Sequence, residues 1–301
     1  MKVLITGACG MVGRQLVGVL QKAGHTLRLS DSSRPEDATV FVPGQAERQK
    51  VPVKFDAPFV QLSILHGPEM LKACQGMDAV IHLATLPSGL YELGQQIMEA
   101  SVVGTYVVMD AAHRAGVKRV FYASSINAFG TIYWRVSGKP PVYPKMPLRE
   151  TEFTPVPEDP YSLGKWVNEL TAATFHRAFG GTYAGFRFAG VWGDAMYQDF
   201  KQHNMKPTTA WNDDLYQWVH IQDVVEGLAK ALACPALPGC GVYTLGAGDT
   251  RCPEPTMEIL QRFRPDLAAT LERPLIGREP LMSIRTAQET FGYAPRFRLA
   301  D

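Results

Sequence analysis

Tyr161 and Lys165, four residues apart in the chain, are side chains well suited to proton transfer. They open a stretch to about Phe179 that is predicted to be a helix. Residues four apart share one helix face, so the lysine ammonium is expected to lie near the phenol and to lower its pKa. Tyr161 could then exchange a proton with a substrate hydroxyl. An aromatic–cation pair on a helix surface would explain the same two residues without chemistry.

Two serines, Ser124 and Ser125, follow an apolar run at 119–123 that is predicted to be a buried strand. The carboxyl ends of parallel strands face the ligand crevice of a doubly wound sheet. A hydroxyl at this place could hydrogen-bond the reacting oxygen of a substrate. A serine that caps a turn is the alternative explanation.

A glycine-rich segment, Thr6-Gly-Ala-Cys-Gly-Met-Val-Gly13, joins a predicted strand to a predicted helix. In this context Gly7 permits a tight turn, Gly10 lets a pyrophosphate approach the backbone, and Gly13 lets the helix pack closely on the strand. The first helical residues, Met11 and Val12, then present free N–H groups to phosphates. The segment therefore predicts a dinucleotide site, with incidental glycines in a turn as the alternative.

An acidic residue, Asp31, follows the second predicted strand. A carboxylate there can accept both hydroxyls of an adenosine ribose and would repel a 2′-phosphate, which favours NAD over NADP as cofactor. Arg34 is close enough in sequence to weaken this preference. A loop-capping Asp is the alternative.

Short apolar runs alternate with helical stretches along the chain, as in a doubly wound parallel sheet of the α/β class, the Rossmann fold. The predicted strands are 2–6, 26–30, 51–55, 79–83, 119–123, 183–188 and 242–245, and the main predicted helices are 11–23, 68–74, 95–115 and 161–179, with another from 223. The predicted dinucleotide-binding domain comprises residues 1–188 plus 219–246. A substrate lobe is predicted from residues 189–218 plus 247–301.

The 301 residues carry a formal net charge of +1 without a run of like charge, so neither nucleic acid nor an anionic membrane is expected as a partner. Eighteen consecutive apolar residues do not occur, and a secretory leader is not recognisable. The five cysteines lack CxxC spacing, and the histidines do not cluster, so we expect structural thiols, no metal site and a cytoplasmic protein.

Several motifs in fixed order resemble the extended short-chain dehydrogenase/reductase family, of the NAD-dependent epimerase/dehydratase type. They are the glycine-rich turn, Val80-Ile-His-Leu-Ala84, Tyr122-Ala-Ser-Ser-Ile-Asn-Ala-Phe-Gly130, Tyr161-x-x-x-Lys165, Trp218-Val-His-Ile-Gln-Asp-Val-Val225 and Gly292-Tyr-Ala-Pro295. The resemblance covers nearly the whole chain.

The resemblance implies that Ser125, Tyr161 and Lys165 form a catalytic triad, with Lys165 also holding the nicotinamide ribose. It implies that a homodimer forms through two helices of each subunit. Further residues are expected near the cofactor: Asp56 near the adenine, Ala84 in the cleft, and the backbone of Ala189 and Val191 at the nicotinamide. The residues expected to contact a small-molecule substrate are Thr85, Asn127, Arg187, Trp192 and Arg278.

The chain departs from the nucleotide-sugar members of that family at several positions. Gly190 stands where an Asn is usual, and Tyr216-Gln217 replaces Arg-Asp. A diphosphate would want fixed cations, so these departures point away from it, although Arg278 matches a late arginine of the family. Aromatic residues at Tyr133, Trp134 and in 192–218 could stack on sugar rings, and core packing is the commoner explanation.

These features predict an NAD-dependent oxidoreductase that acts on a secondary alcohol or carbonyl of a sugar, a sugar acid or a related small molecule. A nucleotide-sugar epimerase or dehydratase with retained NAD is the first alternative. The second is a dinucleotide-sensing protein without catalysis, for which loss of Tyr161 or Lys165 would be expected.

Overall fold

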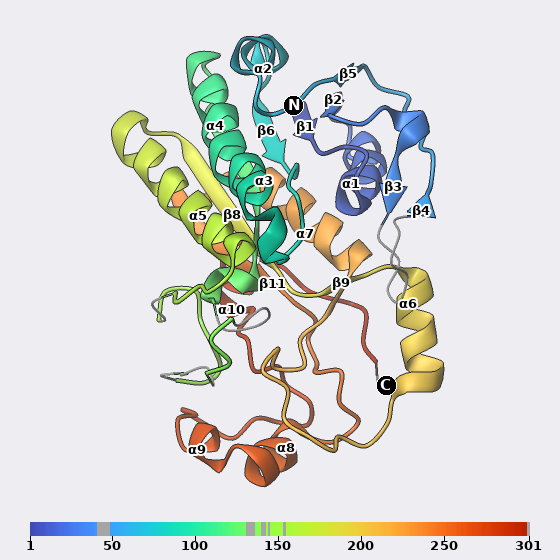
Figure 1. Cartoon of the computed structure of the whole chain (residues 1–301), viewed down its shortest axis with the longest axis vertical. Helices are drawn as coiled ribbons and strands as arrows, with labels where there is room; N and C mark the ends of the chain where they lie inside the picture. Colours follow the sequence, from blue (N-terminus) through green and yellow to red (C-terminus); the bar gives the residue numbers. More distant parts are fainter. Residues whose placement is uncertain (41–48, 131–135, 140–142, 144, 153–154, 300–301) are drawn as a thin grey trace. The chain divides into compact units, whose positions relative to one another are not determined.

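The computed structural model describes residues 1–40, 49–130, 136–139, 143, 145–152 and 155–299. Its main feature is a seven-stranded sheet with the order β11-β8-β7-β6-β1-β2-β5 (Figure 1). The strands are β1 (Lys2–Thr6), β2 (Thr26–Asp31), β5 (Phe59–Gln61), β6 (Ala79–His82), β7 (Arg119–Ser125), β8 (Thr182–Phe188) and β11 (Cys240–Leu245). Neighbours from β5 to β7 pair in parallel. The predicted fold class is confirmed, and the strand order reverses between β1 and β6, where such sheets bind ligands.

The central strands are buried on both faces, which is why they are short apolar runs without alternation. Val3, Leu4 and Ile5 of β1 are fully buried, and so is most of β6. The hydroxyl of Thr6 lies 2.7 Å from Nδ1 of His82, whose Nε2 lies 3.1 Å from the hydroxyl of Thr105. His82 thereby joins the two strands to a helix directly beneath the glycine-rich turn.

Three helices share one core with one face of the sheet. They are α2 (Gly67–Cys74), α4 (Gly104–Arg114) and α5 (Pro160–Phe179), which contribute Met70, Val108 and Phe175 to a cluster that also contains Leu4 and Val80. Helix α1 (Met11–Lys22) buries Leu16, Val17 and Leu20 at helical spacing. The predicted helix 95–115 is formed by α3 (Gly94–Met98), a π-helical turn (Glu99–Val103) and α4 in succession.

The remaining elements are short, apart from α7. Strand β9 (Val191–Trp192) pairs in parallel with β10 (Val219–His220), and β3 (Thr39–Val40) pairs antiparallel with β4 (Gln49–Lys50). The helices are α6 (Asp194–Asp199), α7 (Ile221–Ala233), α8 (Thr256–Phe263), α9 (Pro265–Ala268) and α10 (Arg285–Phe291), with 3-10 turns at Pro35–Asp37, Tyr91–Leu93 and Ile126–Phe129 and a π turn at Phe200–Asn204.

The predicted strand 51–55 is not formed, and the strand that pairs with β2 lies later, at Phe59–Gln61. Residues 51–53 pair elsewhere, since the N–H of Val51 donates to the carbonyl of Ala38 at 2.8 Å and that of Val53 to the carbonyl of Pro35 at 3.0 Å. The helix predicted to open at Asp223 begins at Ile221, because the Nδ1 of His220 accepts the N–H of Gln222 at 3.2 Å and caps it. Tyr133 and Trp134 lie outside the described residues.

Two compact units make up the chain. Unit 1 contains residues 1–124, 167–185 and 238–241, and unit 2 contains residues 125–166, 186–237 and 242–301. The predicted division into a dinucleotide domain and a substrate lobe stays a prediction. Each unit is described separately below.

Candidate active site

The turn between β1 and α1 packs so tightly against neighbouring backbone that glycine is required at two positions. Gly7 has φ 73°, and a Cβ on it would lie 2.6 Å from the backbone N of Ala84. A Cβ on Gly13 would lie 2.8 Å from Cα of Ala8 and closer still to the carbonyl oxygen of Gly7. Gly13 therefore lets the helix pack on the turn itself, rather than on the strand as expected. The N–H groups of the first helical turn, from Met11 and Val12, start directly after Gly10 and suit a pyrophosphate.

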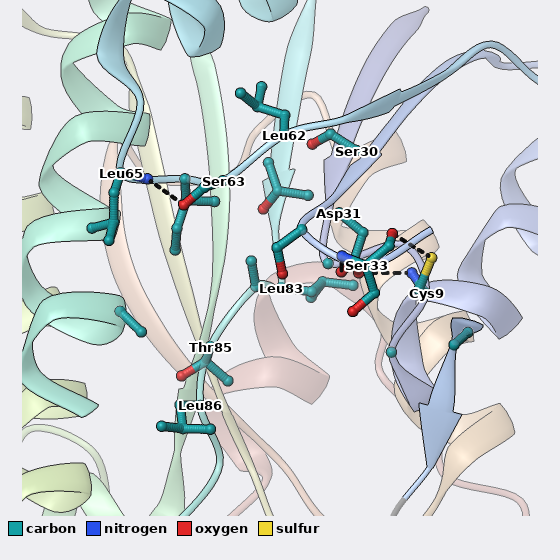
Figure 2. A pocket seen from close by; sticks show the side chains of 18 of the residues that line it. Cys9, Ser30, Asp31, Ser33, Leu62, Ser63, Leu65, Leu83, Thr85 and Leu86 are labelled. Atoms are coloured by element: carbon teal, nitrogen blue, oxygen red, sulfur yellow. Dashed lines mark hydrogen bonds between the residues drawn. The ribbon is translucent and has the colours of Figure 1, made fainter. Parts of the chain in front are cut away.

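A cavity of ≈ 400 Å³ in unit 1 lies next to this turn (Figure 2). It is lined by Gly7 and Gly10, by residues 30–33 at the end of β2 and just beyond it, by 62–65 after β5 and by 83–86 after β6. The predicted residues Gly7, Gly10, Asp31, Ala84 and Thr85 thus come together around one space. A glycine cradle opening into a cavity fits the pyrophosphate and adenosine of a dinucleotide.

Asp31 is held by the turn that it helps to shape. Its Oδ2 accepts the N–H of Cys9 at 3.0 Å, and its Oδ1 accepts the N–H of Ser33 at 3.0 Å. Each carboxylate oxygen keeps a further lone pair that could accept a ribose hydroxyl. The nearby cation of Arg34 donates to Oε1 of Gln61 at 3.3 Å. Arg14 donates to the carbonyl of Cys9, so both guanidinium groups are held by neutral acceptors.

Asp56 does not belong to the lining of this cavity. Its side chain is exposed, and its carbonyl accepts from Nε2 of Gln21 at 3.5 Å. Residues 62–65, which follow the observed strand β5, line the cavity instead, and they include Ser63 with its hydroxyl. The place of Asp56 near the adenine was implied by the family resemblance alone, and the lining of this cavity does not support it.

The triad residues lie together in unit 2. Ser125 ends β7, and its hydroxyl accepts the N–H of Asn127 at 3.2 Å and hydrogen-bonds the phenol of Tyr161. Nζ of Lys165 lies 5.5 Å from the centroid of the Tyr161 ring, and the lysine is 2% exposed. A buried ammonium, a phenol and a hydroxyl in this order could move a proton to or from a substrate oxygen.

Asp159 positions the helix that carries this pair. Its Oδ1 accepts the N–H groups of Tyr161 and Ser162, both at 2.9 Å, and so caps the first turn of α5. Sequence reasoning overlooked this residue. An Asp directly before Pro160, at the start of a predicted helix, was the signal that could have found it.

The pKa of Tyr161 differs from the sequence-based expectation. The pKa of Tyr161 is raised to about 12, mainly because the phenol is buried; the hydrogen bond from Ser125 opposes this rise, and the Asp159 carboxylate adds a smaller one. The expected lowering of the pKa is therefore not observed, because burial disfavours the phenolate. Without bound ligands, the phenol is therefore protonated at neutral pH.

The residues predicted to bind the substrate differ in their surroundings. Asn127 is 3% exposed, and its Oδ1 has no partner within the described residues, so it is free to take up a ligand. Arg187 is 2% exposed, with its guanidinium 4.2 Å from the Phe129 ring centroid. Thr85 lies in the cavity of unit 1.

Two of the predicted substrate residues are occupied within unit 2. Trp192 is 7% exposed and packs against the rings of Phe200 and Trp218 at 4.8 and 5.1 Å, which makes it part of a core cluster. Arg278 forms an ion pair with Asp249. Trp192 is therefore enclosed, whereas Nη1 of Arg278 has no partner among the described residues, and the substrate roles of both stay predictions.

Ala189 and Val191 follow β8 directly. The N–H of Ala189 donates to the carbonyl of Leu245 at 3.1 Å, and Val191 pairs with Val219 in the β9–β10 ladder. Their backbone is thus fixed at the carboxyl end of β8, as a ligand-facing segment should be.

No helix in the described ranges has the length and apolar character of a membrane span. Over the same residues, no cluster of three or more His, Cys, Asp or Glu side chains is arranged to hold a metal ion.

The sequence matches the model of a known protein family. The sequence model of the NAD dependent epimerase/dehydratase family matches residues 3–246. Uronate dehydrogenase from Pseudomonas syringae pv. tomato is 23% identical over 250 residues, which cover 83% of this chain and 75% of that protein.

Solved structures share the fold. The UDP-glucose 4-epimerase of Thermotoga maritima, with UDP-glucose, superposes with a TM-score of 0.68 at 21% identity, covering 99% of this chain and 95% of that one. The UDP-glucuronic acid 4-epimerase of Bacillus cereus, in complex with NAD, gives 0.67 at 18% identity, with coverage of 99% and 95%.

Proposed function

The chain belongs to the NAD dependent epimerase/dehydratase family of enzymes, and from this premise we propose that it oxidises or reduces a secondary alcohol or carbonyl of a sugar, a sugar acid or a related small molecule. The hydrogen-bonded pair Ser125 and Tyr161, with the buried Lys165 beside the phenol, carries the proposal. The resemblance to a uronate dehydrogenase supports a sugar acid as the first substrate to test.

The proposed chemistry uses three side chains. In the oxidising direction, the phenolate form of Tyr161 takes the proton of the substrate hydroxyl and becomes the phenol, while the substrate carbon gives up a hydride. Ser125 hydrogen-bonds the same substrate oxygen and orients it, and the ammonium of Lys165 favours the phenolate form. NAD, when bound, supplies the hydride acceptor. In the reverse direction the protonated phenol, with its raised pKa, donates to the carbonyl oxygen.

The residues proposed to hold NAD are those of the glycine cradle and its surroundings. Gly7, Gly10 and Gly13 leave room for the pyrophosphate, and the N–H groups of Met11 and Val12 face it. Asp31 is proposed to accept the adenosine ribose, with Ala84 beside it. Lys165 and the backbone of Ala189 and Val191 are proposed to serve the nicotinamide half, and we propose no role for Asp56.

A nucleotide-sugar epimerase or dehydratase is the second candidate, because solved epimerases share this fold. Two observations weigh against a diphosphate. Tyr216 stands where such enzymes carry an arginine, and Arg278 is already paired with Asp249. We therefore rank the dehydrogenase first.

Cofactor content decides between the two. Freshly purified protein is denatured, and the supernatant is assayed for NAD and NADP by enzymatic cycling. An empty protein that then reduces added NAD in the presence of D-galacturonate or D-glucuronate supports the dehydrogenase. Near-stoichiometric released NAD, with conversion of UDP-glucose or UDP-glucuronate, would instead support the epimerase or dehydratase.

Tyr161→Phe tests the proton-transfer role directly. Turnover is expected to fall by about 10²–10⁴-fold, the usual contribution of a general acid or base, while NAD binding by calorimetry is unchanged. Tyr91→Phe, at an exposed tyrosine in the Tyr91–Leu93 turn, is the matched control. Wild-type turnover in Tyr161→Phe would remove the residue from the mechanism.

We also propose a cytoplasmic homodimer. All five cysteines are free thiols, which suits a reducing compartment. Within unit 1, Tyr106 of α4 and Phe175 of α5 are in edge contact at 5.4 Å, and the apolar side chains Val103, Tyr106 and Leu170 are at least half exposed nearby. Light scattering should give twice the monomer mass, and Tyr106→Glu should reduce it to the monomer mass.

A further inference from the structure

The side chain of Gln217 is buried at the carboxyl ends of two neighbouring strands in unit 2. It is 1% exposed. A Cβ built on Gly246 would lie 3.0 Å from Oε1 of Gln217, 3.4 Å from Ile284 and 3.9 Å from Cβ of Ala189. Gly246 follows β11 and Ala189 follows β8, and the N–H of Ala189 donates to the residue before Gly246. The amide therefore lies on the edge of the sheet that binds ligands in this class of fold.

Both polar atoms of this amide lack a hydrogen-bond partner within the part of the chain that the structure describes. The backbone of the same residue is satisfied. Its N–H donates to the carbonyl of Asp214 at 3.2 Å, and its carbonyl accepts from Arg251 at 3.5 Å. Buried polar atoms are seldom left without partners, because they lose water without replacement. Unpaired donor and acceptor atoms on one side chain thus point to a ligand that is absent here.

The turn that presents Gln217 is strained. Leu215 and Tyr216 have φ values of 57° and 55°, a region that side chains other than glycine rarely adopt, and they do so in succession. Asp214 holds the turn, since its Oδ1 accepts the N–H of Tyr216 at 2.9 Å and its Oδ2 pairs with Arg251 at 2.6 Å. The fold therefore maintains an unfavourable backbone directly before an unsatisfied amide, a combination found at functional sites.

We propose that Gln217 is a positioning residue that binds two neighbouring hydroxyls, or a hydroxyl and a carbonyl, of a neutral part of the substrate. An amide offers donors at Nε2 and an acceptor at Oε1 side by side, which matches a vicinal diol, whereas an ionised carboxylate has acceptors only and would leave Oε1 without a donor. The nearby cation of Arg251 is neutralised by Asp214.

The place of Gln217 fits this role. Ser125 ends β7, and β7, β8 and β11 are consecutive in the sheet. With strands about 4.8 Å apart, the ends of β8 and β11 lie one and two strand spacings, roughly 5–10 Å, from the end of β7. This is the span of a sugar ring. The proposal rests on the proposed function for the identity of the ligand, and on the unpaired amide alone for its existence.

The first test needs no substrate. Gln217→Met keeps the length of the side chain and removes the unpaired atoms, so the NAD-free variant should melt at the same temperature as the wild type or higher. Gln288→Met, an exposed position on α10, is the matched control. A melting temperature several degrees below that of the control would show that the amide has partners in the folded protein, and would overturn the proposal.

The second test uses D-galacturonate and D-glucuronate as probes, with NADH formation as the readout. Gln217→Met should raise KM so that kcat/KM falls about tenfold or more, with NAD affinity unchanged. A deoxy analogue that lacks one of the two bound hydroxyls should lose activity with the wild type but little further with the variant. Equal KM values in the two proteins would overturn the proposal. If the wild type turns over neither probe, the proposed function fails, and the melting experiment still decides whether the amide is unpaired.

Discussion

Gly13 and Gly18 both lie in α1, but replacing each of them with alanine is expected to have opposite effects on the free energy of unfolding. A Cβ on Gly13 would lie 2.8 Å from Cα of Ala8, about 0.6 Å inside the 3.4 Å at which ordinary contacts begin, and nearer still to the carbonyl of Gly7. Those are backbone atoms, so the turn itself must move. At Gly18 a Cβ meets nothing within 4 Å.

The expected magnitudes follow from these contacts. Overpacking costs about 1–3 kcal/mol, and alanine returns up to about 1 kcal/mol of helix propensity, so Gly13→Ala should lose about 1–2 kcal/mol of unfolding free energy. Gly18→Ala should gain about 0.5–1 kcal/mol. Displacing the turn should also remove at least one charge-assisted bond to the pyrophosphate, which corresponds to about 10–100-fold in NAD affinity.

Urea denaturation and calorimetric titration with NAD measure the two effects separately. Gly18→Ala should bind NAD like the wild type. If Gly13→Ala gains stability as Gly18→Ala does and keeps its NAD affinity, then neither the close packing of the turn nor its role as a pyrophosphate cradle can be maintained.

Three further outcomes are expected. Asp31→Asn should weaken NAD binding about tenfold and narrow the preference for NAD over NADP, as measured by calorimetry with both nucleotides. An unchanged ratio of the two affinities would contradict the proposal that Asp31 accepts the ribose hydroxyls. Burial raises the pKa of Tyr216 to about 12, so the folded protein keeps a proton that the unfolded chain loses near pH 10. Stability from this residue is complete below about pH 10 and is lost as pH rises towards 12, and Tyr216→Phe should flatten that decline in urea titrations. Trp192→Ala should cost about 3–5 kcal/mol of unfolding free energy if the residue is core, and a stable variant with raised KM would restore its predicted substrate role.

The sequence allowed good prediction wherever a local pattern determines the structure. The turn from Gly7 to Gly13, the strands around it and the helix with Tyr161 each depend on spacing within one segment, and all were placed correctly. The strand at 51–55 was misplaced because two short apolar runs compete there, and only pairing with β2 selects the later one.

Features that depend on packing could not be read from spacing. The raised pKa of Tyr161 comes from burial, and no i, i+4 pattern reports burial. Arg278 is paired with Asp249, 29 residues away in sequence, and Trp192 is enclosed by Phe200 and Trp218. The unpaired amide of Gln217 likewise depends on the packing around it, and no local sequence pattern indicates it.

The way in which the two units share the chain has a consequence for synthesis on the ribosome. Unit 1 begins with residues 1–124 but is completed only by residues 238–241, 114 to 117 residues later. At about 5–20 residues per second, the ribosome needs roughly 6–23 s to supply them. In the later part of that time, after β8 ends at Phe188 and before β11 begins at Cys240, the growing sheet has an open edge on β8, and such edges recruit other chains. Expression at reduced translation speed should therefore increase aggregation unless chaperones cover that edge.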